Sequence, residues 1–209
     1  MTKNIIPHDH TVKQADRIKR LGYRPILIWF VGLSGSGKST LASGLETRLF
    51  NEGINTYILD GDNIRSGLNR DLDFSDDSRK ENLRRITEVS NLFVDAGTVV
   101  LTAFITPFKE ERDKVRKMMG DNYVEVFVNC PLEECEKRDV KGLYQKAREG
   151  KIKNFTGIDS PFEEPTSADI EVRSHQISIE EGVQRIYDIV IGKIRKVRSL
   201  ESEAGRLKP

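Results

Sequence analysis

The sequence predicts an α/β fold in which a doubly wound, mainly parallel sheet is flanked by helices on both faces. Short apolar runs rich in β-branched and aromatic residues alternate along the chain with stretches whose apolar residues recur at helical spacing. This alternation is typical of parallel strands joined by helices. The length of 209 residues suits one well-packed domain of this kind and is too short for two comfortable ones. We therefore predict a single domain over residues 1–209.

The chain is expected to begin with a polar leader and a helix, which together occupy residues 1–24. The helix is predicted over about residues 12–21. Thr11 and Gln14 form a capping-box signature, in which side chains satisfy backbone N–H groups of the first helical turn. This signature places the start of the helix next to Thr11.

A strand, a glycine-rich loop and a helix follow this leader. Residues 25–31 are a continuous apolar run, as expected of a buried parallel strand. Residues 32–39 match the pattern G-x-x-x-x-G-K-[ST] in full. Beyond the loop, apolar residues recur at helical spacing until Asn51 and Gly53 interrupt them. The recurring residues are Leu41, Ala42, Leu45 and Leu49.

The glycine-rich loop has the composition of a P-loop, which binds a polyphosphate. Its glycines allow the backbone to curl so that successive N–H groups form an anion nest, and the following helix adds its positive end. Lys38 can reach the β- and γ-phosphates, and the hydroxyl of Ser39 is placed to ligate Mg²⁺. The sequence therefore predicts a P-loop NTPase fold that binds a nucleoside triphosphate. The residues predicted to bind this nucleotide, which the family resemblance given below identifies as ATP, are Gly32, Leu33, Ser34, Gly35, Ser36, Gly37, Lys38, Ser39 and Thr40.

The alternation of strands and helices continues through the rest of the chain. Ser78 and Glu81 form a second capping-box signature, which opens a helix that ends at Gly97. A charged helix is expected over residues 108–119, and Pro131 is expected at the first position of the next helix. The remaining strands are predicted at residues 54–60, 98–104, 123–129 and 168–172. A final helix is predicted from the stripe of Val183, Ile186, Val190, Ile194 and Val197.

Two segments do not follow this pattern. Residues 137–162 show no convincing core stripe, yet they contain seven cations and three interspersed glycines. Such a segment beside a P-loop is predicted to be a mobile lid that closes over phosphates and excludes water. The alternative is a solvated surface loop, which is the ordinary explanation of a charge run. The charged tail at residues 198–209 is also predicted to be mobile.

Composition excludes several classes of function. The 34 Lys and Arg residues balance 33 Asp and Glu residues, which argues against a dedicated surface for a nucleic acid polymer. No apolar run approaches the ~20 residues that span a bilayer, and the N-terminus lacks the apolar region of a signal peptide. Cys130 and Cys135 are expected to pack in the interior, as is usual in a reducing cytoplasm. We predict a cytoplasmic protein that does not bind membranes.

Two carboxylates favour phosphoryl transfer over the other reactions of P-loop proteins. The Asn-Lys-x-Asp motif that reads guanine is missing from the sequence. Asp60 and Asp62, which flank Gly61, stand at the end of the predicted strand next to the P-loop helix. One carboxylate can face the metal and the other an acceptor hydroxyl, as transfer to a bound alcohol requires. The alternative is a plain Asp-Gly turn.

The order of these motifs resembles the adenylylsulfate kinase family, which makes 3′-phosphoadenylyl sulfate from ATP and adenosine 5′-phosphosulfate (APS). The resemblance covers about residues 4–172. It rests on six blocks, at residues 28–40, 59–65, 74–82, 104–107, 141–144 and 154–159.

The family's roles transfer to the matching positions. The resemblance implies that Phe74 and Phe155 sandwich the acceptor's adenine and that Asp62 accepts the proton of its 3′-hydroxyl. The metal is assigned to Ser39 and Asp60. The catalytic residues are predicted to be Asp62, Lys38, Lys141 and Thr106. The substrate-binding residues are predicted to be Asp62, Arg65, Phe74, Arg79, Asn82, Ile105, Thr106, Lys141, Leu143 and Phe155.

One position departs from the family pattern. The chain has Thr106 where the family usually shows serine in Phe-Ile-Ser-Pro, and that serine has been described as a phosphorylated intermediate in some members. Threonine keeps the hydroxyl, but its β-branch restricts rotation. Since direct transfer needs no intermediate, we interpret Thr106 as a residue of the substrate loop.

Two other functions stay open at this point. The first is a P-loop kinase for another small alcohol or nucleotide, although the aromatic pair favours a purine. The second is a nucleotide-binding module without catalysis, which would not need both carboxylates. The resemblance also implies a homodimer and a possible association with ATP sulfurylase.

Overall fold

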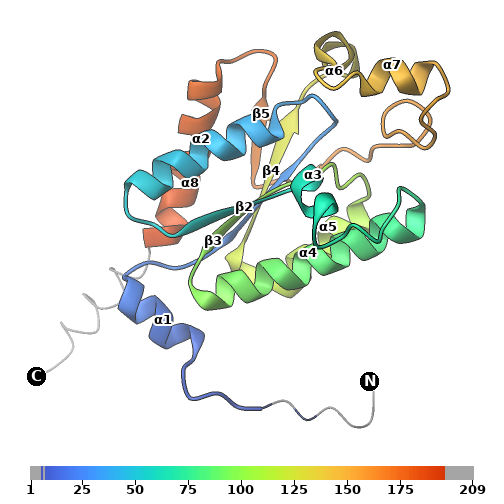
Figure 1. Cartoon of the computed structure of the whole chain (residues 1–209). Helices are drawn as coiled ribbons and strands as arrows, with labels where there is room; N and C mark the ends of the chain where they lie inside the picture. Colours follow the sequence, from blue (N-terminus) through green and yellow to red (C-terminus); the bar gives the residue numbers. More distant parts are fainter. Residues whose placement is uncertain (1–5, 7, 196–209) are drawn as a thin grey trace, which may run out of the picture.

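The centre of the protein is a five-stranded parallel sheet (Figure 1). The computed structural model describes residue 6 and residues 8–195. The strand order is β2-β3-β1-β4-β5, and all four pairings are parallel, which confirms the predicted sheet. The strands are β1 Leu27–Val31, β2 Thr56–Asp60, β3 Val99–Ala103, β4 Tyr123–Asn129 and β5 Ile170–Arg173.

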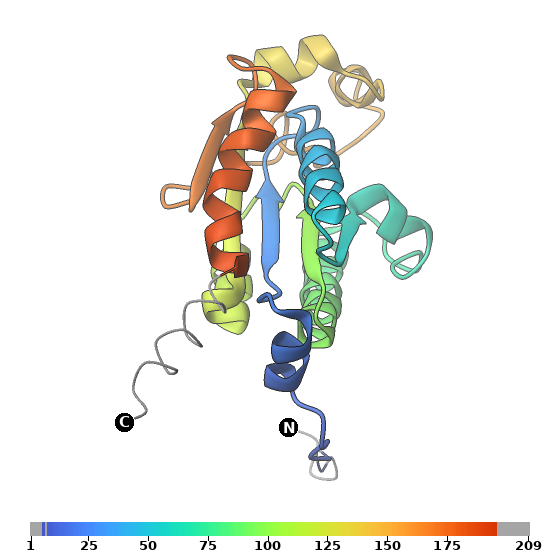
Figure 2. The same ribbon diagram turned by 90° about the vertical axis from the view of Figure 1, so that its left-hand side faces the viewer.

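Helices cover both faces of this sheet (Figures 1 and 2). Helices α2 (Lys38–Asn51) and α8 (Ile179–Arg195) pack on one face, and α4 (Asp76–Ala96) and α5 (Lys109–Met119) pack on the other. Because successive side chains of a strand point to opposite faces, β1 contributes to both cores. Ile28 and Phe30 belong to the first core, while Leu27, Trp29 and Val31 belong to the second. All five residues are fully buried, as the continuous apolar run predicts.

Two helices begin at different residues than the capping signatures predict. Helix α1 is Gln14–Leu21, and the backbone N–H of Lys13 donates to the carboxylate of Asp16 at 2.9 Å. The capping box predicted at Thr11 and Gln14 is therefore wrong, because the helix begins only at Gln14 and is capped by Asp16, two residues beyond Gln14.

Helix α4, by contrast, begins earlier than its signature at Ser78 predicts. Its N-cap is Ser75, whose hydroxyl accepts from the N–H of Ser78 at 3.4 Å. Glu81 does not reach back to the N-terminus, because it bonds to two arginines of its own helix. The helix does end at Gly97, which adopts the left-handed conformation with φ 103°.

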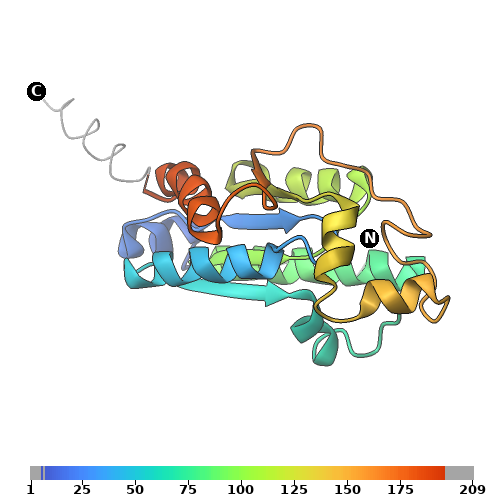
Figure 3. The same ribbon diagram turned by 90° about the horizontal axis from the view of Figure 1, so that it is seen from above.

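Several short elements lie beyond the carboxyl ends of the strands, where Figure 3 shows α6 and α7. Pro131 stands at the N-cap and not at the first helical position. The segment at residues 137–162 contains α7 and three buried apolar residues, Tyr144, Ala147 and Phe155, which correct the expectation that it lacks a core. These elements are α3 Gly61–Ser66, α6 Leu132–Arg138 and α7 Leu143–Arg148. A short 3₁₀ turn, η1 at Gly120–Asn122, lies at the opposite edge of the sheet, directly before β4.

This third core packs under the P-loop. It joins the three buried residues to Leu33 and to both cysteines, which are buried as predicted. Burial raises the pKa of the Cys135 thiol to about 12, so the thiol stays protonated and packs as a small apolar group.

The last predicted strand and helix are present with shifted ends. Strand β5 begins two residues later than residue 168. The apolar stripe of α8 packs on the sheet through Val183, Ile186, Val190 and Ile194. Val197, the predicted tail at 198–209, and residues 1–5 and 7 of the leader lie outside the described residues. Among the helices that are described, none is long and apolar enough to cross a membrane.

Candidate active site

The P-loop connects β1 to α2 at the carboxyl edge of the sheet. Gly32 and Gly37 have φ angles of 152° and 102°, and Gly37 directly precedes the helix. A Cβ atom on Gly32 would lie 2.6 Å from the carbonyl oxygen of Val128 on the neighbouring strand. Only glycine therefore allows the loop to leave the sheet this closely.

Lys38 is the buried cation of this loop. Its side chain lies in the interior, and its Nζ donates to the carbonyl oxygen of Leu33 at 2.7 Å. Burial lowers the pKa of Lys38 to about 8, and the nearby Asp60 opposes this shift. A desolvated ammonium with one neutral partner is electrostatically ready for a phosphate, because desolvation strengthens its attraction to an anion.

Three side chains from distant parts of the chain hold the outer side of the P-loop. The hydroxyl of Tyr144 donates to the carbonyl of Ser34 at 2.9 Å, and the hydroxyl of Ser174 donates to the carbonyl of Ser36 at 2.6 Å. Arg138 donates to the carbonyl of Gly35 at 3.2 Å. These contacts use carbonyl oxygens of the loop and not its N–H groups. Sequence reasoning missed all three, since each partner lies more than 100 residues away.

The two carboxylates at the end of β2 lie beside the P-loop, as predicted. Ser39 Oγ donates to Asp60 Oδ2 at 2.6 Å. The other oxygen of Asp60 accepts from the N–H of Asp62 at 3.1 Å, so Asp60 is the N-cap of α3. Asp62 forms an ion pair with Lys141 from the segment at 137–162. This chain of contacts brings the P-loop, the carboxylates and the predicted lid together.

The hydroxyl of Ser39 and the carboxylate of Asp60 fit a magnesium ion. Mg²⁺ prefers hard oxygen ligands and is usually held by one or two side chains together with substrate phosphates and water. Within the described residues, no three His, Cys, Asp or Glu side chains form a cluster that could hold a metal by themselves. The donor set is thus one that needs a nucleotide's phosphates to complete it.

A second group of predicted residues surrounds the loop between α3 and α4. The ring of Phe74 is exposed, and the guanidinium of Arg65 lies 4.5 Å from its centre. Arg79 donates to the carbonyl of Phe74 at 2.9 Å and to the carbonyl of Asn154 at 2.6 Å. Arg79 therefore joins the segment of Phe74 to that of Phe155, the two aromatic residues that the sequence predicts to act together.

The two aromatic residues differ in their surroundings. Phe74 is 65% exposed, whereas Phe155 is 9% exposed and meets Tyr144 edge-on, with ring centres 5.0 Å apart. Asp159 accepts from the N–H of Asn154 at 2.8 Å and from that of Phe155, which fixes the backbone beside the ring. Phe155 is therefore a buried ring with a fixed backbone, whereas Phe74 is an exposed ring at the surface.

Three further predicted residues contact neighbouring elements. Asn82 is buried, and its Oδ1 accepts from Asn69. Leu143 is the first residue of α7 and packs against the third core. The carbonyl of Ile105 accepts from the N–H of Gly32 at 3.4 Å, so the loop after β3 adjoins the P-loop.

Thr106 is enclosed within that loop. It is 2% exposed and has a left-handed φ of 43°, which is unusual for a β-branched residue. The indole Nε1–H of Trp29 donates to its hydroxyl at 3.0 Å, and the buried Arg112 donates to its carbonyl at 2.9 Å. Sequence reasoning missed Trp29 and Arg112 as supports of this turn. The hydroxyl of Thr106 is thus engaged as an acceptor inside the protein.

These features define a class of protein. The P-loop supplies a phosphate site, and paired carboxylates follow the edge strand β2. Arg65 and Arg79 contact the segment of Phe74, and Lys141 pairs with Asp62. The fold and the site therefore define a P-loop kinase that phosphorylates a small molecule.

Comparison with known proteins identifies the family. The family model for adenylylsulphate kinase matches residues 24–173. A probable adenylyl-sulfate kinase of Halalkalibacterium halodurans is 56% identical over 185 residues, which is 88% of this chain and 92% of that protein. An adenylyl-sulfate kinase of Clostridium kluyveri is 53% identical over 193 residues, or 92% of this chain and 97% of that protein.

A solved structure agrees with the sequence relatives. The APS kinase CysC of Mycobacterium tuberculosis in complex with AMPPNP and APS superposes with a TM-score of 0.76 at 47% identity. The match covers 80% of this chain and 98% of the other. The chain belongs to the adenylylsulfate kinase family, and the resemblance stated from the sequence is confirmed.

Proposed function

We propose that this protein transfers the γ-phosphoryl group of ATP directly to the 3′-hydroxyl of APS. The observation that carries the proposal is the junction of the two halves of the site. Ser39 of the P-loop helix bonds to Asp60, and Asp60 caps the short helix that carries Asp62. A donor phosphate on the P-loop and an acceptor hydroxyl at Asp62 would therefore be neighbours. The family's reaction requires that arrangement.

Asp62 is proposed as the general base. Its side chain is 70% exposed and pairs with Lys141, whose side chain is 59% exposed. Such an exposed pair contributes little stability, because water screens both charges. An incoming hydroxyl can therefore replace part of this contact, after which Asp62 takes the proton and Lys141 stays near the transferred charge.

Lys38 and Lys141 are proposed to neutralise the charge that spreads over the equatorial oxygens during transfer. Ser39 and Asp60 are proposed to hold Mg²⁺, which neutralises the β- and γ-phosphates when it is bound. The phosphoryl group then passes between two oxygen atoms that the protein has already positioned. Positioning therefore contributes most of the rate enhancement.

The acceptor is proposed to bind between Phe74 and Phe155. Stacking of a base between aromatic rings contributes ~1–3 kcal/mol per base without selecting its edge. Arg65 and Arg79 provide cationic groups for the phosphosulfate, and Asn82 provides an amide. A purine nucleotide with an anionic 5′-group fits this combination better than a sugar acid does.

Some broader expectations remain part of the proposal. We propose that residues 137–162 act as a lid, which is supported by the ion pair from Lys141 across the site. A homodimer and a possible association with ATP sulfurylase are proposed on the family resemblance alone. A cytoplasmic location is proposed on the two buried, free cysteines, which suit a reducing compartment.

A product assay tests the function. Purified protein with Mg²⁺ and ATP is incubated with APS, adenosine 5′-monophosphate, gluconate or shikimate, and products are separated by chromatography. We expect 3′-phosphoadenylyl sulfate as the dominant product. The Lys38→Ala variant serves as the negative control. Robust phosphorylation of gluconate or shikimate with no turnover of APS would contradict the proposal. Nucleotide binding without any product would favour a silent module.

A further inference from the structure

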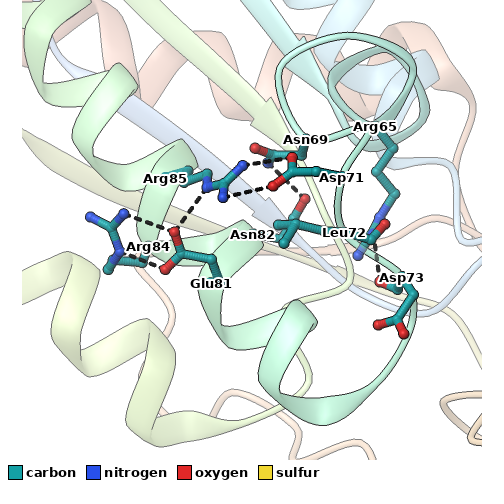
Figure 4. A network of polar contacts seen from close by, with 9 residues as sticks. All are labelled: Arg65, Asn69, Asp71, Leu72, Asp73, Glu81, Asn82, Arg84 and Arg85. Carbon is teal, nitrogen blue, oxygen red and sulfur yellow. Dashed lines mark hydrogen bonds and ion pairs between the residues drawn. The ribbon is translucent and has the colours of Figure 1, made fainter.

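The loop at residues 67–75, between α3 and α4, presents Phe74 without an apolar anchor of its own. Leu68 and Phe74 are 49% and 65% exposed. Ordering a loop costs ~1–2 kcal/mol per residue, so this conformation needs other contacts to hold it. The contacts are polar and come from α4 (Figure 4).

We propose that these contacts form a positioning device for the acceptor nucleotide, which we call the loop clamp. The clamp touches neither Lys38 nor Asp62, and it acts on the acceptor by fixing the loop that carries Phe74 and by orienting the amide of Asn82. The inference rests on the proposed function, because it assigns Phe74 to the acceptor. The loop clamp consists of Asn69, Asp71, Glu81, Asn82 and Arg85.

The first arm of the clamp is a fork of charged hydrogen bonds. Arg85 donates through its two terminal nitrogens to both oxygens of Asp71, at 2.8 and 2.9 Å, and through Nε to Glu81 at 2.8 Å. Figure 4 shows the guanidinium between the two carboxylates. The hydrogen bonds from Arg85 lower the pKa of Asp71. Because a bidentate pair fixes direction as well as distance, Asp71 orients the loop relative to α4.

The second arm is a pair of buried amides. Asn69 is fully buried, and its Nδ2 donates to Oδ1 of Asn82 at 2.9 Å. The backbone N–H of Asn69 also donates to the carbonyl of Ile64 at 2.9 Å. Because Oδ1 of Asn82 accepts this bond, the NH₂ group of Asn82 points away from the amide of Asn69. The amide that the sequence assigns to the nucleotide is therefore held in one of its two orientations.

The clamp works together with contacts closer to Phe74. Arg65 donates to the carbonyl of Asp73 at 2.9 Å and lies over the ring of Phe74. The clamp fixes the first half of the loop, and Arg65 and Arg79 fix the second half. Weakening the clamp should therefore lower affinity for the acceptor while the P-loop still binds ATP.

The neighbouring residue Arg84 supplies a matched control. It lies on the same helix and bonds to the same Glu81 at 2.7 and 2.8 Å, but on the side away from the loop (Figure 4). We compare Arg85→Ala with Arg84→Ala by steady-state kinetics with APS and ATP. We expect Arg85→Ala to raise the KM for APS about tenfold, a loss of ~1.4 kcal/mol. The KM for ATP and kcat should change less than about twofold in both variants, since neither arginine touches the P-loop.

Limited proteolysis reports on the loop without any turnover. Arg70 is an exposed tryptic site inside the loop. We expect trypsin to cleave after Arg70 several-fold faster in Arg85→Ala than in the wild type or Arg84→Ala. Local opening of a loop governs such cleavage. Unfolding midpoints identify a variant that simply fails to fold, and Asp71→Asn, which keeps the side-chain volume, then repeats the test.

A double variant and a polarity change complete the experiment. Asp71→Asn combined with Arg85→Ala should cost little more than either change alone, because both remove the same contact. Asn69→Asp replaces the donor Nδ2 by an acceptor oxygen, so the amide of Asn82 should rotate to present its NH₂ group instead. This rotation should also raise the KM for APS.

The outcomes separate the inference from the function. Equal effects of Arg84→Ala and Arg85→Ala, parallel losses for both substrates, or unchanged cleavage after Arg70 would overturn the clamp. If the wild type phosphorylated another acceptor, the proposed function would fail, whereas the cleavage test would still decide whether the clamp orders the loop.

Discussion

The P-loop and the loop at residues 67–75 belong to the donor half and the acceptor half of the proposed site, and they are ordered in different ways. The P-loop is shaped by glycines between packed strands, and its lysine is 8% exposed. The acceptor-side loop presents a phenylalanine that is 65% exposed and is held by arginines and carboxylates. The donor half is therefore made of backbone and buried contacts, and the acceptor half of side chains.

The difference has consequences for how the two halves respond to substitution. In a site formed by backbone groups, few single side chains can be removed without also disturbing the binding of ATP. A site built from side chains can lose affinity for its ligand one contact at a time, while the other half stays intact. Substitutions on the acceptor side should thus separate acceptor affinity or turnover from ATP binding.

Asp62→Asn should give the largest separation of this kind. Removal of a general base typically lowers the rate ~10²–10⁴-fold, while Asp62 bonds to Lys141 and not to the P-loop. We expect kcat to fall by this factor and the Kd for an ATP analogue, measured by calorimetry, to stay within about twofold. Asp77→Asn, at an exposed position on α4, is the control. Near-normal turnover by Asp62→Asn would assign the base elsewhere.

Lys38 should give the donor half a distinct pH dependence. Burial lowers the pKa of Lys38 from 10.5 to about 8, so the free protein loses this positive charge as the pH rises through 8. Phosphate affinity should fall with it, by about tenfold between pH 7 and pH 9. Calorimetric titration of an ATP analogue measures this fall, and Lys38→Met corrects for ionisation of the nucleotide. A wild-type profile parallel to that of Lys38→Met would exclude Lys38 as the titrating group.

Thr106→Ala should have the smallest effect on transfer. The change removes one neutral hydrogen bond, worth ~0.5–1.5 kcal/mol, and leaves the buried indole of Trp29 without its partner. We expect a two- to tenfold loss in kcat/KM for APS, a lowered unfolding midpoint and no phosphate label on the wild-type protein. Thr106→Ser keeps the hydroxyl and serves as the control. Complete loss of transfer in Thr106→Ala alone would indicate a covalent role.

The sequence predicts the parts of this structure that depend on local pattern. Strand β4 is predicted at its observed bounds, and the P-loop has the predicted strand and helix on either side. Gly97 ends its helix as predicted, because a left-handed C-cap needs little more than the glycine itself. Helix starts are less certain, since Ser75 and Ser78 are both good caps and tertiary packing decides between them.

The contacts that order the site were not predictable from pattern. Trp29 and Thr106 are 77 residues apart, and Arg138 and Gly35 are 103 apart. Tyr144 lies in a cation-rich segment, where a single buried aromatic gives no periodic signal. Each of these contacts depends on which loops the sheet brings to one edge. The candidate site residues can therefore be predicted from sequence motifs, whereas the residues that hold them in place depend on the topology of the fold.

The central claim is that the phosphoryl group passes in one step from the donor half to the acceptor half, with Thr106 as a structural residue. The stereochemical course at phosphorus tests this claim directly. ATP that is chiral at the γ-phosphorus, through oxygen isotopes, is used to phosphorylate APS, and the configuration of the product is determined. One in-line transfer predicts inversion. Retention would require two successive transfers and would contradict the account, because an enzyme residue would then carry the phosphate.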